Sequence, residues 1–258
     1  MSTNEDFMDY DVDTDYGLEF TPPILQWRRG DLANPNPILK NGGWQASVEH
    51  WPALPGQTIE VVHSGGVIVP SHLFEKLSLA VLTYRKQWFI TNGDQITWLQ
   101  PGDYREGAKS RLQVWCLIKE FDNEPALISV KSMNAKYLEE AIKNHVQKII
   151  APASRQAKKS FARFHFWMPI SADDKKDVGH GQYITPPICP LTNYNLDVIK
   201  KLFVGSDVAA IAEAEMIQAK EWAETKPEPP AIEPMDYQDT NGYAHSHPEP
   251  IEEDEIPF

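Results

Sequence analysis

Residues 111–119 read Arg-Leu-Gln-Val-Trp-Cys-Leu-Ile-Lys, and the two sets of alternate positions differ in character. Successive side chains of a β-strand point to opposite faces of the sheet, so alternate residues share a face. One face would carry four apolar side chains typical of a core, namely Leu112, Val114, Cys116 and Ile118. The other face would carry Arg111, Gln113, Trp115, Leu117 and Lys119. This stretch therefore predicts a strand with one buried face and one face that combines a tryptophan with cations.

Residues 160–169 predict a second strand with the same division. One face would carry Phe161, Arg163, His165 and Trp167, and the other Ala162, Phe164, Phe166 and Met168. A third run, over residues 82–90, is less regular. Its positions 84, 86 and 88 are Tyr, Lys and Trp, but Arg85 and Gln87 occupy the opposite face. We therefore predict two strands with a tryptophan-and-cation face and a third that is less clearly divided.

The rest of the body alternates short β-like runs with Gly- and Pro-containing turns. Further strands are predicted over residues 58–62, 67–69, 79–90, 95–99 and 126–131. Asn92-Gly93 between two aromatic-rich runs predicts a hairpin. Helical spacing of apolar residues predicts helices over residues 134–150, 193–204 and 206–223, the last with Ser206 as its N-cap. The pattern predicts an α+β, β-rich fold: a small barrel or sandwich, with an OB-like barrel as first choice, an inserted helix and a C-terminal helical segment.

The 258-residue chain has a formal net charge of −13, but its acidic residues concentrate at the two ends. Residues 1–20 carry a net −7 and residues 224–258 a net −9, which leaves +3 for residues 21–223. The C-terminal stretch is rich in Pro, Glu and Asp and has too few apolar residues to form a core. We therefore expect a flexible acidic N-terminus, a mildly basic folded body and a disordered acidic tail, with those boundaries.

Within the body, residues 143–165 contain no acid and six cations: Lys143, Lys148, Arg155, Lys158, Lys159 and Arg163. Such a cluster is the electrostatic footprint of a site for a polyanion. A solvated basic surface would have the same composition.

Several classes of protein are disfavoured by the sequence. No stretch approaches the ~20 uninterrupted apolar residues that span a bilayer, and the acidic N-terminus is unlike a secretory signal. Two cysteines, Cys116 and Cys189, cannot build a disulfide framework. We therefore expect a cytoplasmic protein that does not act at a membrane.

Three motifs resemble catalytic or metal sites only in part. Residues 102–110 resemble a phosphate-binding P-loop but have one residue too many, and a strand-like run follows where that loop needs a helix. Residues 11–15 lack the spacing of a calcium loop, and His245 and His247 lack a third ligand. We therefore expect no enzymatic activity, no cofactor and no metal.

The predicted tryptophan-and-cation faces favour unpaired nucleic acid as a ligand. Unpaired bases stack on aromatic side chains and Lys and Arg follow the phosphates, whereas a duplex hides the faces of its bases. The predicted contacts are Arg111, Trp115, Lys119, Lys158, Lys159, Phe161, Arg163, His165 and Trp167. The alternative is that Trp115 and Trp167 are core residues, since tryptophans are mostly buried.

The chain ends in Glu252-Glu253-Asp254-Glu255-Ile256-Pro257-Phe258. This acidic run with a terminal Ile-Pro-Phe resembles the C-terminal tip of the bacterial single-stranded-DNA-binding protein family. More loosely, it is similar to the acidic, Phe-terminated tails of some phage DNA-binding proteins. The resemblance implies that Asp254, Glu255, Ile256, Pro257 and Phe258 capture replication, recombination or repair proteins.

Together these features predict a non-enzymatic protein that coats single-stranded DNA and recruits other proteins through its tip. Three alternatives stay open: a strand-annealing recombination protein, an adaptor that binds only proteins through its acidic ends, and an RNA-binding protein. Edge strands of an open β-rich body can pair, so we also expect a homo-oligomer.

Overall fold

A computed structural model describes residues 21–30, 34–54, 58–62, 68–92, 95–99, 105–177, 183–191 and 194–225 of the chain. Its strands are β1 (Ile24–Arg29), β2 (Gly42–Ser47), β3 (Thr58–Val62), β4 (Ile68–Phe74), β5 (Lys76–Asn92), β6 (Gln95–Leu99), β7 (Lys109–Ile118), β8 (Glu124–Lys131), β9 (Met168–Ala172), β10 (Lys176–Asp177), β11 (Tyr183–Ile184) and β12 (Pro187–Ile188). Its helices and helical turns are α2 (Pro37–Asn41), η3 (Lys119–Phe121), α3 (Ser132–His145), η4 (Val146–Ile150), α4 (Ala151–Ala157), η5 (Arg163–His165), α5 (Leu196–Leu202) and α6 (Ser206–Glu224).

Ten strands form one mixed sheet. Nine of them follow the order β12-β9-β5-β7-β8-β1-β2-β4-β3, and β6 pairs with β5 beside this path, while β10 and β11 form a separate pair. The β1–β8 pair is parallel and the other described pairs are antiparallel. The prediction of an α+β, β-rich fold is confirmed. Among the described residues, β3 and β12 are the two end strands of the sheet and do not pair with each other. The sheet is therefore not closed into a barrel.

The sheet is strongly curved and encloses the main core. Trp44 of β2 donates its indole N–H to the carbonyl of Ile170 on β9, at 3.4 Å, although four strands separate β2 from β9 in the sheet order. The predicted apolar face of β7 lies in this core, and all four of its side chains are 0 % exposed: Leu112, Val114, Cys116 and Ile118. Helix α3 packs on this face through Leu138 and Ile142.

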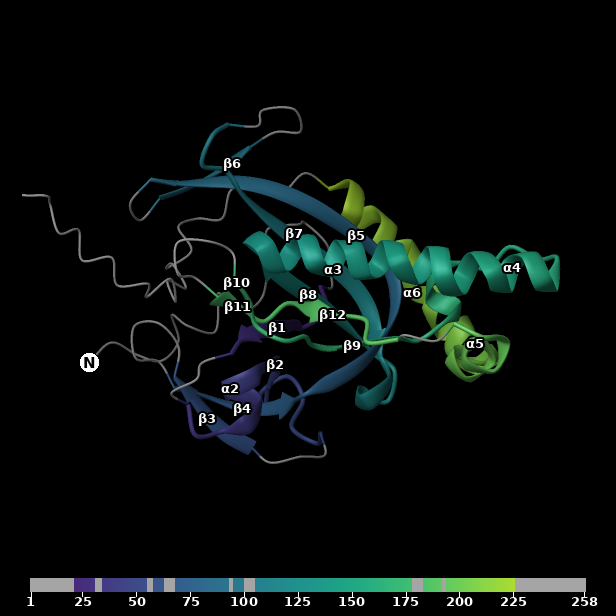
Figure 1. Ribbon diagram of the computed structural model, residues 1–258, viewed down its shortest axis with the longest axis horizontal. Coiled ribbons are helices and arrows are strands. Elements are labelled where there is room, and N and C mark those ends of the chain that lie inside the picture. Colours follow the sequence, from purple (N-terminus) through teal and green to yellow (C-terminus); the bar gives the residue numbers. More distant parts are fainter. Residues whose placement is uncertain are drawn as a thin grey trace, which may run out of the picture.

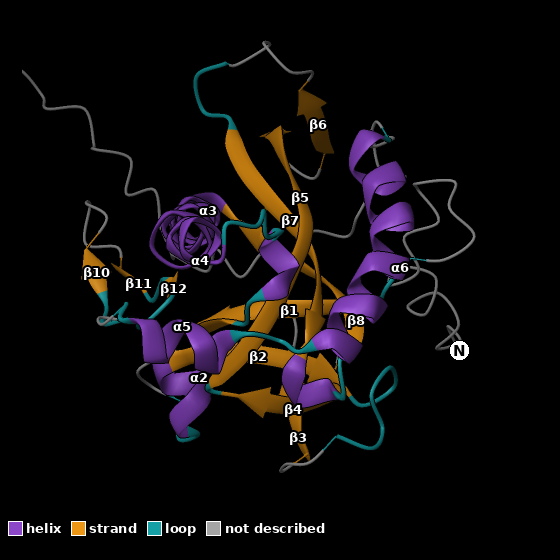
Figure 2. Cartoon of the chain, turned by 90° about the vertical axis from the view of Figure 1, so that its right-hand side faces the viewer, coloured by secondary structure: helices purple, strands orange, loops and turns teal. Residues whose placement is uncertain are grey.

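Helix α6 covers the opposite face of β5 and β7. Figure 2 shows these strands between α3, seen end-on, and α6. Trp222 of α6 is 0 % exposed and packs with Leu82, Leu117 and Leu127 in a second core cluster. Two helices remote from each other in the sequence thus cover the two faces of one pair of strands.

A buried arginine on β5 fixes the end of α6. The guanidinium of Arg85 donates to the carbonyls of Trp222 (3.0 Å) and Thr225 (3.2 Å) and to the side chain of Gln113 (2.9 Å). Its Cζ also lies 4.1 Å from the centroid of the Trp222 ring. The last carbonyls of a helix have no partner within the helix, and a cation there also interacts favourably with the helix dipole. Arg85 is therefore a structural residue, which explains why a charged side chain occupies the α6 face of β5.

The predicted strand over residues 160–169 is not formed as such. Its first half is an extended segment and the turn η5, and only Met168–Ala172 is a strand, β9. The Trp167 N–H donates to the carbonyl of Leu202 (2.7 Å), and the Val204 N–H donates to the carbonyl of His165 (3.0 Å). Around His165 to Trp167 the backbone is thus paired with the connection between α5 and α6, and pairing with the long strand β5 begins only at Met168. The side chains of the predicted strand consequently do not divide into two faces.

The predicted helix over residues 134–150 is part of a longer one that runs from α3 through η4 into α4 (Figure 1). Pro152 has no N–H for the carbonyl of Lys148 and its ring crowds that carbonyl. The chain widens just before it into the π-helical turn η4, in which the Ala151 N–H bonds to the carbonyl of Val146. Both predicted C-terminal helices are present, but α5 is shorter than the predicted residues 193–204, and the N-cap of α6 is Gly205 rather than Ser206.

Candidate nucleic-acid interface

Two tryptophans predicted to stack on bases are core residues. Trp115 is 0 % exposed, and its ring lies edge-on to that of Trp222 with centroids 5.6 Å apart. Trp167 is 5 % exposed and belongs to the same cluster. The prediction that these rings face a ligand is wrong, because α6 covers the Trp115 face of β7 and Trp167 packs in the core cluster beneath this helix. The alternative reading of both residues as core is confirmed.

Two of the predicted cations lie at opposite ends of β7. Arg111 is half-buried near the start of the strand, on the face toward α6. Lys119 is exposed in η3, just beyond the end of the strand, with its Nζ 6.0 Å from the Trp167 ring centroid. Eight residue steps at about 3.3 Å each put them roughly 26 Å apart. They do not share a site on this strand.

The structure brings the five remaining predicted residues together at the end of α4 and in the turn that follows: Lys158, Lys159, Phe161, Arg163 and His165. Both lysines are exposed, and Lys158 ends α4 in the left-handed conformation, with φ 48°. The Nδ1 atom of His165 accepts a hydrogen bond from the Ala162 N–H at 3.0 Å. His165 therefore holds the turn, and the two lysines, Phe161 and Arg163 remain as groups with exposed or half-exposed side chains.

Three cations lie over three aromatic rings of β5 and of the turn after α4, and the Arg163–Tyr84 contact joins these two parts of the chain. We call this set of residues the cation–ring row. Lys86 lies 5.2 Å from the Trp88 ring, Arg163 5.0 Å from the Tyr84 ring and Lys159 5.7 Å from the Phe161 ring, each measured to the centroid. All three rings are half-buried. The row therefore consists of Tyr84, Lys86, Trp88, Lys159, Phe161 and Arg163.

The β5 part of this row is the less regular run of the sequence. Tyr84, Lys86 and Trp88 alternate on the α3 side of the strand, while Arg85 lies on the α6 side. The period of two in Tyr-Lys-Trp was a usable signal. The alternation was hard to recognise because Arg85 interrupts it in the sequence as if it were a second exposed cation, whereas it is buried and caps α6.

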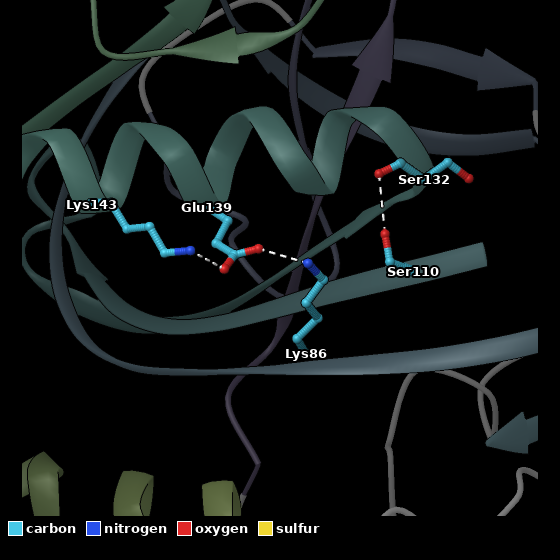
Figure 3. Close-up of polar contacts among 5 residues, drawn as sticks. All are labelled: Lys86, Ser110, Ser132, Glu139 and Lys143. Carbon is cyan, nitrogen blue, oxygen red and sulfur yellow. Dashed lines mark hydrogen bonds and ion pairs between the residues drawn. The ribbon is translucent and has the colours of Figure 1, made fainter. Parts of the chain in front are cut away.

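Glu139 of α3 binds two lysines at the centre of this region (Figure 3). Its carboxylate accepts from Lys86 of β5 at 2.8 Å and from Lys143 of α3 at 2.5 Å. Partial burial raises the pKa of the Glu139 carboxyl, but the hydrogen bonds from Lys143 and Lys86 outweigh burial and bring it below its ordinary value. The carboxylate thus holds two cations side by side at the edge of β5.

A pocket of about 390 Å³ opens at the end of the row, between the long helix and α6. Four parts of the chain form its walls: Leu82 and Thr83 of β5, Val146 and Ile150 of η4, the stretch Phe161 to Phe164, and Met216 and Lys220 of α6. Most of these side chains are apolar. Arg163 and Lys220 are cations on different walls, and Arg163 also belongs to the cation–ring row.

The remaining features of the sequence lie partly inside and partly outside the described residues. Lys109 and Ser110 lie in β7 rather than at a helix start, as expected for a segment that is not a P-loop. Within the described residues no three His, Cys, Asp or Glu side chains are grouped as metal ligands require. The helices that the structure describes include none with the length and apolarity needed to cross a membrane. Residues 1–20, His245, His247 and the tip Asp254–Phe258 lie outside the described residues.

Comparison of the chain with protein-family models, with curated proteins and with solved structures finds no match.

Proposed function

We propose that this protein binds single-stranded DNA without catalysing a reaction, and that it does so along the cation–ring row. One observation carries the proposal: three half-buried rings of β5 and of the turn after α4 each have a cation 5.0–5.7 Å from the ring centroid. A base can stack on each ring while the adjacent cation reaches a phosphate. Each such stack contributes about 1–3 kcal/mol, so three rings supply useful affinity without sequence preference.

The mode of binding that we propose is OB-like, in the sense that a curved sheet presents rings and cations from its strands. The long strand β5 contributes Tyr84, Lys86 and Trp88, and its partner in the row is the turn after α4. Such a surface does not require a closed barrel. A duplex offers no base faces to these rings, which is why a single strand is favoured.

We further propose that the tail recruits replication, recombination or repair proteins through Asp254–Phe258, and that the protein acts in the cytoplasm as a homo-oligomer. This part is supported by the acidic tip with its terminal aromatic residue. Light scattering with and without DNA measures the oligomeric state.

The test is an anisotropy titration of labelled single-stranded DNA, duplex DNA and single-stranded RNA of equal length, each at two salt concentrations. The variant Arg163→Gln should reduce affinity for the single strand and lower the slope of log affinity against log salt by about 1. Tyr84→Leu keeps an apolar side chain but removes the ring, and should weaken binding by about 1–3 kcal/mol.

Lys201→Gln, an exposed lysine of α5, is the matched control for the loss of one charge. Lys119→Gln distinguishes the contacts predicted from the sequence, which include Lys119, from the cation–ring row, which does not. If the row is the interface, this variant should not lower the affinity more than Lys201→Gln does. If duplex and single strand bind equally well, or if both controls match Arg163→Gln, the proposed interface is refuted. Mixing complementary strands measures annealing separately.

A further inference from the structure

Two irregularities of the backbone meet at the pocket between the long helix and α6. The register between β5 and β7 shifts between Val81 and Thr83, which is a bulge, and Leu82 and Thr83 both line the pocket. On the facing wall, Val146 and Ile150 begin and end the π-helical turn η4. Bulges and π-turns are over-represented at functional sites, where they redirect side chains. Here the bulge in β5 and the π-helical turn η4 both contribute residues to the wall of the same pocket.

The walls combine apolar contact with two separated cations. Phe161 and Phe164 lie on one side and Met216 on another, so a flat apolar group would meet rings and a polarisable thioether. The two cations stand apart: Arg163 belongs to the turn η5, whereas Lys220 projects from α6. A volume of about 390 Å³ lies within the range of sites for small molecules, about 300–1,000 Å³. The chemistry suits a flat, largely apolar group joined to an anion.

We propose that this pocket receives one base of the bound strand, turned out of the stack, while Arg163 and Lys220 contact phosphates beside it. The inference rests on the proposed function, since the row leads to the pocket through Arg163. A base in the pocket would fix the strand at one point, whereas the open part of the row permits sliding. The occupant is a nucleotide of the strand, and the phosphates next to it account for the two cations.

The test fills the pocket and compares two ligands that differ only in their bases. Ala162 lines the pocket with φ −78° and ψ 166°, a conformation open to any L-residue, so Ala162→Phe places a ring in the space. The probes are a thymidine strand and an abasic strand of the same length. Ala162→Phe should lower the ratio of the affinity for the thymidine strand to that for the abasic strand about fivefold or more, which corresponds to the loss of one stacked base.

Ala214→Phe is the matched control, because Ala214 lies on the same helix as Met216 and is exposed. If thermal melting finds Ala162→Phe unfolded, Met216→Trp fills the pocket from a half-buried position on α6 and is read in the same way. A ratio that changes no more than in Ala214→Phe overturns the pocket inference but leaves the row standing. If the unaltered protein binds neither strand, the proposed function itself fails.

Discussion

Substitution of Glu139 tests directly whether Lys86 and Lys143 bind a phosphate of the DNA. The Glu139 carboxylate accepts from both lysines, at 2.8 and 2.5 Å, where a phosphate oxygen would otherwise bind. A phosphate within about 4 Å of this carboxylate would meet a repulsion of about 1 kcal/mol at the dielectric constant of water. We therefore expect Glu139→Gln to tighten binding of single-stranded DNA about fivefold at low salt, and the gain to shrink as salt screens the charge.

The cost to folding should be small. The side chains of Lys86, Lys143 and Glu139 are 33 %, 58 % and 17 % exposed, and exposed ion pairs contribute about 0–1 kcal/mol. Anisotropy titrations at two salt concentrations measure the affinity, and urea unfolding measures the stability. Glu140→Gln removes the same charge from the next residue of α3, which is exposed, and is the matched control. If Glu139→Gln has no larger effect than Glu140→Gln, or weakens binding, then the two lysines do not contact phosphate.

Three further predictions concern the fold and the tail. Arg85→Met should lower the free energy of unfolding by about 2–4 kcal/mol in urea titrations, because it removes charged hydrogen bonds to the end of α6. A loss below about 0.5 kcal/mol would contradict the capping role. Burial lowers the pKa of His145 to about 4. The free energy of unfolding should therefore be highest above pH about 6.5 and fall by about 2–3 kcal/mol as the pH drops to about 4.5, because the unfolded chain binds the proton more tightly. His145→Phe should make this decline with pH smaller. Deleting Glu252–Phe258 should tighten DNA binding at low salt and abolish capture of partner proteins, whereas Phe258→Ala should lose only the capture; a pull-down and a titration distinguish these outcomes.

Alternation along a strand identifies which residues share a face, but not what covers that face. Leu112, Val114 and Cys116 were predicted as core from their period of two, and they are. The same pattern could not reveal that Trp115 is covered, because the covering residue, Trp222, lies more than 100 positions further along the chain. The burial of a tryptophan depends on such remote contacts, which no local pattern contains.

Two consecutive glycines near the start of the body have a role that the sequence does not show, for a different reason. Asn41-Gly42-Gly43 reads as a turn, yet Gly42 and Gly43 open strand β2. A side-chain carbon on Gly43 would lie 2.7 Å from the carbonyl oxygen of Phe74, and Gly42 has φ 93° beside Thr185. Glycine is therefore needed in this strand because other parts of the chain approach its backbone closely. The signal in the sequence was real, but it marked close approach rather than a turn.

The two faces of β5 link the stability of the fold to the candidate site. On one face Arg85 holds the end of α6, and on the other Tyr84 and Lys86 belong to the cation–ring row. Helix α6 in turn supplies the pocket wall that carries Lys220. A change at Arg85 should therefore alter binding at the pocket although Arg85 itself does not line it. Among the residues described, β5 is thus a strand on which both folding and the proposed binding depend. Its alternating sequence places the residue that caps α6 on one face and residues of the cation–ring row on the other.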